Sequence, residues 1–210
     1  MRLFCYKLDT DSGFAPNPFF GVLTLATCKP LMRRSKEIGD WIAGFTSKKL
    51  CDDEVGQERL IYLMKVTDKI PIADYYLDPH FQAKIPDLSK RECIYSVGDN
   101  IYRPRTCNPT TSSDFEQIPN RSHCDSNKEK DLSGVFVLIS EQFCYFGRKA
   151  VNISPNVRPD IPKGQSAQGS RTWDSLRAQR FVDYIRASFA QGIHGPPHLW
   201  PPGDDSWKSR

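Results

Sequence analysis

The segment that most constrains the fold is the apolar stretch at residues 134–147, GVFVLISEQFCYFG. Its β-branched and aromatic residues predict two buried strands, interrupted at the polar pair Ser140-Glu141. A second apolar block lies at the start of the chain, where residues 3–8 and 22–28 are typical of strands. Because a single core must bury both blocks, we expect residues 1–50 and 134–151 to form adjacent strands of one sheet.

Length and composition favour one globular domain. The chain has 210 residues, of which 39% are hydrophobic and 26% charged, a typical balance for such a domain. No apolar run reaches the roughly 20 residues that span a bilayer, and the N-terminus does not resemble a secretory signal. The seven cysteines show no paired spacing. We therefore expect reduced thiols, a cytoplasmic protein, no membrane contact and no metal site.

The polar and proline-rich segments mark the boundaries of the expected domain. Residues 103–131 are rich in Ser, Thr, Asn and Pro, which predicts a long, mobile surface loop. Residues 193–210 contain several prolines and predict an irregular tail. The domain should therefore cover residues 1–192.

The remaining elements predict an α+β fold. Strands are expected within 39–45, 60–70 and 93–97, and a short helix should follow Pro30. A longer helix is predicted over 172–190, with Trp173, Leu176 and Phe181 on one face. We expect a strongly bent mixed sheet or partial barrel with this C-terminal helix packed on it.

Several motifs resemble the second family of nucleotide-modification-associated domains. They are SGFAPNPFFGVLTLATCKP from residue 12, Arg33-Arg34-Ser35, GDWIAG at 39–44 and CYFGRKAV at 144–151. The resemblance implies a role in making or handling modified nucleobases in bacteria and their phages, without a settled reaction. A looser likeness to PUA-like, ASCH and EVE modules implies a barrel strand beside a nucleic-acid or base pocket.

The same residues suit a nucleobase and a phosphate. Phenylalanines in the loop at 12–21 could stack on a base, and an asparagine held between prolines could bond to its edge. The following helix N-terminus and its cations could hold a phosphate. The alternatives are a loop that only fills the core and a helix face that only meets solvent. The expected binding residues are Phe14, Asn17, Phe19, Thr27, Lys29, Arg33, Arg34 and Trp41.

Catalytic candidates are few. Cys28 lies before a helix N-terminus, where a thiol can act as a nucleophile, although it could equally be a buried packing residue. Lys29 and Asp40 are the other two candidates. The four histidines lie in loops or in the tail, none is near Cys28 in sequence, and they predict no catalytic triad.

Three classes of function remain open from the sequence. The chain could be an enzyme that processes a nucleobase, as a nucleotide or within nucleic acid. It could be a module that only binds such a ligand. It could also be a non-catalytic interaction subunit of a modification complex, with a protein partner on the tail or the 103–131 segment. The sequence does not identify a cofactor.

Overall fold

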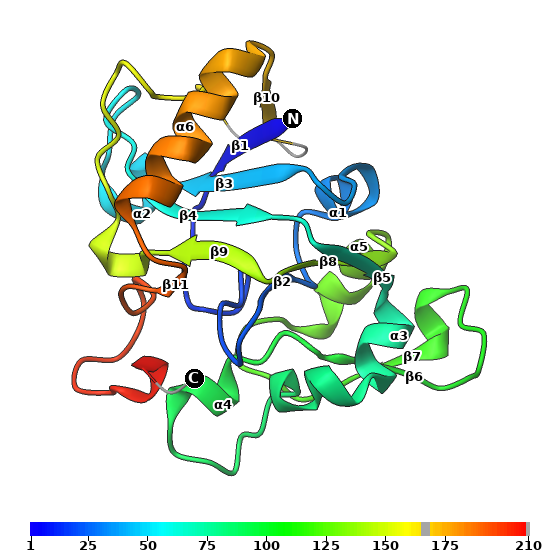
Figure 1. Cartoon of the computed structure of the whole chain (residues 1–210). Helices are drawn as coiled ribbons and strands as arrows, with labels where there is room; N and C mark the ends of the chain where they lie inside the picture. Colours follow the sequence, from blue (N-terminus) through cyan, green and yellow to red (C-terminus); the bar gives the residue numbers. More distant parts are fainter. Residues whose placement is uncertain (165–168, 209–210) are drawn as a thin grey trace.

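The structure, a computed structural model, describes residues 1–164 and 169–208. Its centre is an open, mixed, six-stranded sheet (Figure 1). In spatial order the strands are β10 (Ser170–Thr172), β1 (Leu3–Lys7), β3 (Trp41–Phe45), β4 (Leu60–Lys65), β9 (Gln142–Tyr145) and β11 (Gly192–Ile193). Two pairs, β1 with β3 and β9 with β11, are parallel, and the other three are antiparallel.

A second, three-stranded sheet has the order β2 (Leu23–Leu25), β8 (Phe136–Ser140), β5 (Asp68–Pro71). The apolar run at 134–147 therefore divides as expected at Ser140-Glu141, but its two strands enter different sheets. The single strand expected over 60–70 likewise divides into β4 and β5. Strands from the two apolar blocks do occur in the same sheets. In the second sheet β2 pairs directly with β8. In the six-stranded sheet β4 lies between β3 and β9.

Helix α6 (Ser175–Ser188) covers one face of the six-stranded sheet (Figure 1). The carboxylate of Asp174 caps it by accepting bonds from two backbone N–H groups of the first turn. Its buried side is narrow, consisting of Ala178, Phe181, Val182 and Ile185. The sequence predicted a wider apolar face, and this prediction is wrong for two residues, because Trp173 and Leu176 are 76% and 68% exposed.

The opposite face of this sheet packs against the second sheet and the short helix α1 (Pro30–Ser35). Tyr6, Tyr62 and Tyr145 are buried there, together with Met32 of α1. The sheets form a mixed α+β fold, and the described strands do not close into a barrel.

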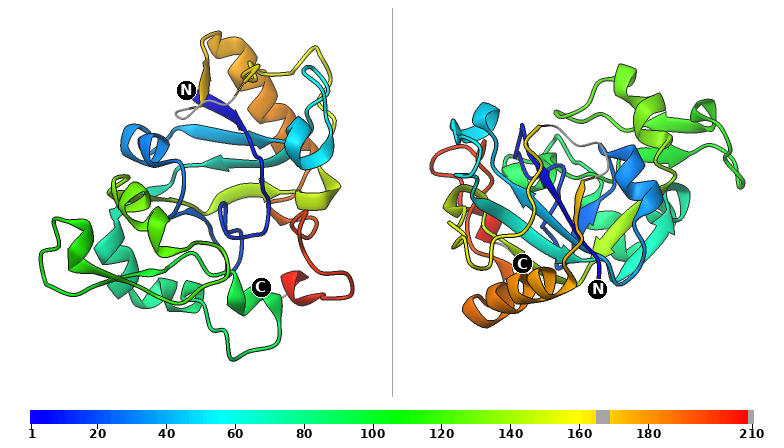
Figure 2. Two further views of the ribbon diagram at one scale, coloured as in Figure 1. Left: turned by 180° about the vertical axis from the view of Figure 1, so that it is seen from behind. Right: turned by 90° about the horizontal axis from the view of Figure 1, so that it is seen from above.

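Residues 72–133 form a long excursion on the side of the molecule away from α6 (Figure 2). Within it, residues 103–131 contain short strands and helices where composition indicated a loop, and Cys93–Ser96 is a helix where a strand was expected. In the tail, the carboxylate of Asp204 and the hydroxyl of Ser206 accept the first N–H groups of this helix. The elements are α3 (Ile72–Leu77), η1 (Pro79–Lys84), α4 (Cys93–Ser96), β6 (Tyr102–Pro104), η2 (Ser112–Asp114), β7 (Phe115–Gln117), η3 (Asp125–Asn127) and α5 (Lys128–Leu132).

The remaining short helices are α2 (Lys48–Cys51), η4 (Gly147–Lys149) and η5 (Ser206–Lys208). The tail folds back onto the loop at 9–20, where Trp200 packs on Phe19 with ring centroids 5.2 Å apart. His198 Nδ1 lies 2.8 Å from an oxygen of the buried Asp11 carboxylate. All seven cysteines lie in the described part of the chain and are free thiols. No helix among the described residues is long and apolar enough to cross a membrane.

Candidate active site

Cys28 lies on a strained turn between strand β2 and helix α1. It has φ 55°, and its neighbour Lys29 has φ 41°, so two consecutive residues with side chains adopt the left-handed conformation. Such residues cost about 1–3 kcal/mol each and are concentrated at functional sites. The backbone N–H of Cys28 donates to Asp131 Oδ1 at 2.8 Å, which holds the turn in this conformation. Pro30 then begins the helix.

His123 and Asp131 complete a chain of hydrogen bonds with Cys28. The Sγ atom of Cys28 is 3.3 Å from His123 Nε2, and His123 Nδ1 is 2.7 Å from Asp131 Oδ2. Both partners come from the excursion that the sequence suggested was a loop. This order of nucleophile, imidazole and carboxylate is that of a catalytic triad. The expectation that no histidine would pair with Cys28 is therefore corrected.

The backbone around His123 holds its ring in place. The Asn120 side chain accepts a bond from the His123 N–H at 2.7 Å, and Gln117 donates to the His123 carbonyl at 2.9 Å. The ring of Phe14 meets the imidazole edge to face, with centroids 4.8 Å apart. The two hydrogen bonds thus fix the backbone of His123, and Phe14 packs on the ring, which keeps the imidazole in place for proton transfer.

The electrostatics of this group favour a charged imidazole. Burial lowers the pKa of His123, but its hydrogen bonds to Asp131 and Cys28 raise it more, to about 10. Burial also raises the pKa of Asp131, yet the bonds from His123 and Tyr102 leave it below the ordinary value. At neutral pH His123 is thus an imidazolium between a carboxylate and a thiol, a natural counter-ion for a thiolate.

Two buried side chains support the triad. The hydroxyl of Tyr102 donates to Asp131 Oδ2 at 2.8 Å. Arg33 is fully buried, and its guanidinium donates to the carbonyls of Cys28, Phe136 and Asp131. The expectation that Arg33 would bind a phosphate is corrected, because these backbone oxygens take up its N–H groups.

A cavity of about 440 Å³ opens beside the Cys28 thiol. Four of the residues expected at a binding or catalytic site line it, namely Phe14, Thr27, Cys28 and Lys29. The cavity also has walls from β1 and from the excursion. Further lining residues are Tyr6, Lys7, Leu8, Asp9, Leu25, Arg121, His123 and Leu199.

The other expected site residues do not line this cavity. The Asn17 amide is buried, with Oδ1 bonded to Lys84 Nζ at 2.8 Å and Nδ2 to the Val97 carbonyl at 3.0 Å. Phe19 packs under the tail, and Trp41 belongs to the core beneath α6. Asp40 binds the Arg2 guanidinium through both oxygens, at 2.6 and 2.7 Å. Asn17 and Asp40 therefore stabilise the fold.

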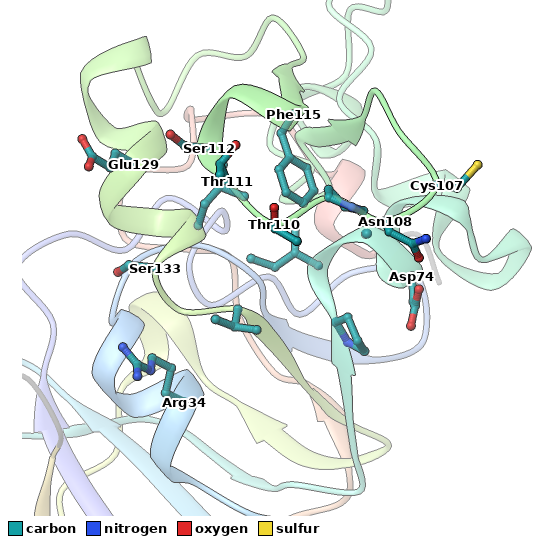
Figure 3. A pocket seen from close by; sticks show the side chains of 16 residues that line it. Arg34, Asp74, Cys107, Asn108, Thr110, Thr111, Ser112, Phe115, Glu129 and Ser133 are labelled. Carbon is teal, nitrogen blue, oxygen red and sulfur yellow. The ribbon is translucent and has the colours of Figure 1, made fainter.

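A larger cavity of about 760 Å³ lies between the excursion and the body of the protein (Figure 3). Arg34 stands at its edge, and hydroxyl groups of residues 110–112 line one side. Its Cys107 and Glu129 lie on opposite sides (Figure 3). No nucleophile is paired with a base among the described residues that line it, so the smaller cavity is the better candidate for chemistry.

The three triad residues also meet the spacing of a metal site. One ligand atom from each of Cys28, His123 and Asp131 lies within 4.8 Å of the others. However, Nδ1 of His123 faces the carboxylate of Asp131, and Nε2 faces the sulfur of Cys28. An ion bound at Nε2 would therefore be coordinated by Cys28 and His123, while Asp131 would bond to Nδ1 and not to the ion. Zinc sites take three or four ligands from the protein, so these two are too few. The geometry fits a hydrogen-bonded triad better.

Comparison with protein families assigns the chain. The family model "Nucleotide modification associated domain 2" matches residues 1–203, nearly the whole length. The chain therefore belongs to this family, as the motifs at 12–44 and 144–151 indicated. The searches of curated proteins and of solved structures gave no match.

Proposed function

We propose that this chain is a thiol-dependent acyl-transfer enzyme acting on a nucleobase-containing compound in a bacterial or phage nucleotide-modification system. The observation that carries the proposal is the hydrogen-bonded series Cys28–His123–Asp131 at the wall of a cavity. Membership of the nucleotide-modification-associated family supports the choice of substrate class. The reaction would be hydrolysis or transfer of an amide or ester substituent.

The first half of the reaction forms a thioester. The Cys28 thiolate attacks the carbonyl carbon of the substituent, and a C–S bond forms as the carbonyl oxygen becomes negative. When this intermediate collapses, the C–N or C–O bond to the leaving group breaks. His123 Nε2–H donates its proton to the departing nitrogen or oxygen. Asp131 keeps the ring oriented through Nδ1 and remains ionised.

The second half releases the acyl group. The now neutral His123 takes a proton from water or from an acceptor amine or hydroxyl, which attacks the thioester carbon. The C–S bond breaks, Cys28 leaves as a thiolate, and His123 is again an imidazolium. No electron transfer is needed, so the cycle balances without an oxidant or reductant.

Covalent trapping tests this proposal. Incubating the protein with acylated nucleobases and nucleotides, and with a simple activated ester as a general acyl donor, should add one acyl group to Cys28. Intact-mass and peptide mass spectrometry would locate it. Cys28→Ala should take up no acyl group at this position. Cys107→Ala, at an exposed cysteine outside the Cys28 cavity, should behave as wild type. Turnover that persists in Cys28→Ala would exclude the proposed nucleophile.

An interaction subunit is the second candidate, and the exposed Trp173 just before α6 and Leu176 in its first turn favour it. Exposed tryptophans are frequent anchors of protein interfaces. This reading predicts that the trapping experiment finds no acyl group on Cys28 with any donor.

A further inference from the structure

The wall of the Cys28 cavity carries more positive than negative charge. Its cationic side chains are Lys7, Lys29, Arg121 and His123, and its acidic side chain is Asp9. Lys7 is paired with Glu58 at 2.6 Å, and His123 with Asp131. Asp9 lies 3.8 Å from Lys49, outside the wall. With Lys7 and His123 paired, the remaining wall charges are those of Lys29 and Arg121 against that of Asp9, so the wall keeps an excess of positive charge.

Lys29 is a half-buried cation in this wall. Its Nζ lies 4.9 Å from the centre of the Tyr6 ring, a cation–π contact that favours the charged form. Burial is the main cause that lowers its pKa. The charges of Asp9 and Cys28 act in the opposite direction, and the nearby Lys130 lowers the pKa further. An anion bound here would offset both the desolvation and the repulsion between the two lysines.

Arg121 is the second cation of the wall that could contact an anion. It is exposed and lies two residues before His123, in the segment that carries the catalytic base. Arginine forms bidentate bonds with phosphate, and lysine binds it as a point charge. The volume of about 440 Å³ falls in the range of small-molecule sites, roughly 300–1,000 Å³.

We propose that the substrate carries a phosphate group that binds between Lys29 and Arg121 while its acyl substituent reaches Cys28. This inference rests on the proposed function and narrows its substrate class to nucleotides, free or within a strand, in place of nucleosides and free bases. It replaces Arg33 and Arg34 as phosphate ligands with two residues that line the cavity.

Binding to the Cys28→Ala protein tests the inference without turnover. The probes are the four common deoxynucleosides, their 5′-monophosphates and a short single-stranded oligonucleotide, titrated at low and moderate salt. At least one monophosphate or the oligonucleotide should bind about tenfold or more tightly than the matching nucleoside, since hydrogen bonds to charged groups are the stronger ones. Higher salt should reduce this preference.

Variants identify the residues responsible. Adding Lys29→Gln and Arg121→Gln to the Cys28→Ala protein should remove most of the phosphate preference. Arg180→Gln is the matched control, because Arg180 is an exposed arginine on α6, which packs on the sheet face opposite to Tyr6, Leu8 and Leu25 of the cavity wall. It should leave the preference unchanged. A monophosphate that binds better than the oligonucleotide indicates a free nucleotide, and the reverse order indicates a strand.

Two results would overturn the inference. One is a nucleoside that binds as tightly as its phosphorylated forms, including the case in which none of the probes binds. The other is a phosphate preference that survives in the Lys29 and Arg121 variants. The proposed function is judged separately, because acylation of Cys28 by an uncharged donor would uphold the triad even if the phosphate inference failed.

Discussion

Asp131→Asn is expected to slow acylation of Cys28 about 10³- to 10⁴-fold while the protein stays folded. The carboxylate accepts the His123 Nδ1–H at 2.7 Å, and it stabilises the imidazolium charge. An asparagine carries no charge to hold the second ring proton, so the imidazole becomes neutral. Cys28 then loses the imidazolium that stabilises its thiolate and that protonates the leaving group. The corresponding exchange in a serine protease costs about this much. The measurement is the rate of acyl transfer to Cys28 from an activated ester.

Two variants at other buried residues serve as controls for this experiment. Tyr102→Phe removes one hydrogen bond to Asp131 but keeps the carboxylate, and should slow acylation tenfold or less. Asp99→Asn changes another buried carboxylate, one bonded to Thr24 and Tyr75 away from the triad. It should leave the acylation rate of the folded protein near that of wild type. A rate in Asp131→Asn similar to that in Asp99→Asn would argue against the triad.

Arg33→Met is expected to reduce the free energy of unfolding by about 3–5 kcal/mol. Its guanidinium satisfies three backbone carbonyls in the interior, and each buried acceptor left without a donor costs about 1–3 kcal/mol. Arg34→Met is the matched control, since Arg34 is the next residue and is exposed. It should change stability by less than about 0.5 kcal/mol. Urea unfolding of both variants measures the difference, and equal effects would refute the structural role of Arg33.

The sequence predicted the strand-and-helix setting of Cys28 because that signal is local. The β-branched run at 22–28 indicates a strand, and Pro30 indicates the start of a helix. Phe14, Thr27 and Lys29 lie within fifteen residues of one another, and the structure places all three at the cavity. The apolar periodicity of the strands similarly predicted much of the core.

The partners of Cys28 could not be predicted in the same way, because the contact spans 95 residues. His123 lies in a polar segment whose composition indicates a loop. One available signal was the length of that segment, since long insertions in compact domains are often functional. The sequence also could not predict that Arg33 is buried while Arg34 is exposed. Their different environments depend on the carbonyls of Asp131 and Phe136, about one hundred positions away.

Asn17 shows how a local motif can mislead. Its place between two prolines suits a rigid group that reads a base edge. In the structure it instead binds the buried ammonium of Lys84, 67 residues away. Burial lowers the pKa of Lys84 to about 8, although the charge of Asp99 opposes the shift. Asn17 is thus explained as a hydrogen-bond acceptor for the buried Lys84, whose burial the sequence did not indicate.

The protonation state of His123 tests the central claim most directly. Its raised pKa means that the proton stays on the ring at neutral pH and leaves only as pH rises through about 10. Imidazole ¹⁵N chemical shifts of the wild-type protein should therefore show both ring nitrogens protonated at pH 7. The titration midpoint should be near 10 and should move toward the ordinary value of about 6.5 in Asp131→Asn. A neutral His123 at pH 7, with a midpoint at or below about 6.5 in the wild type, would contradict the thiolate–imidazolium pair from which the proposed reaction starts.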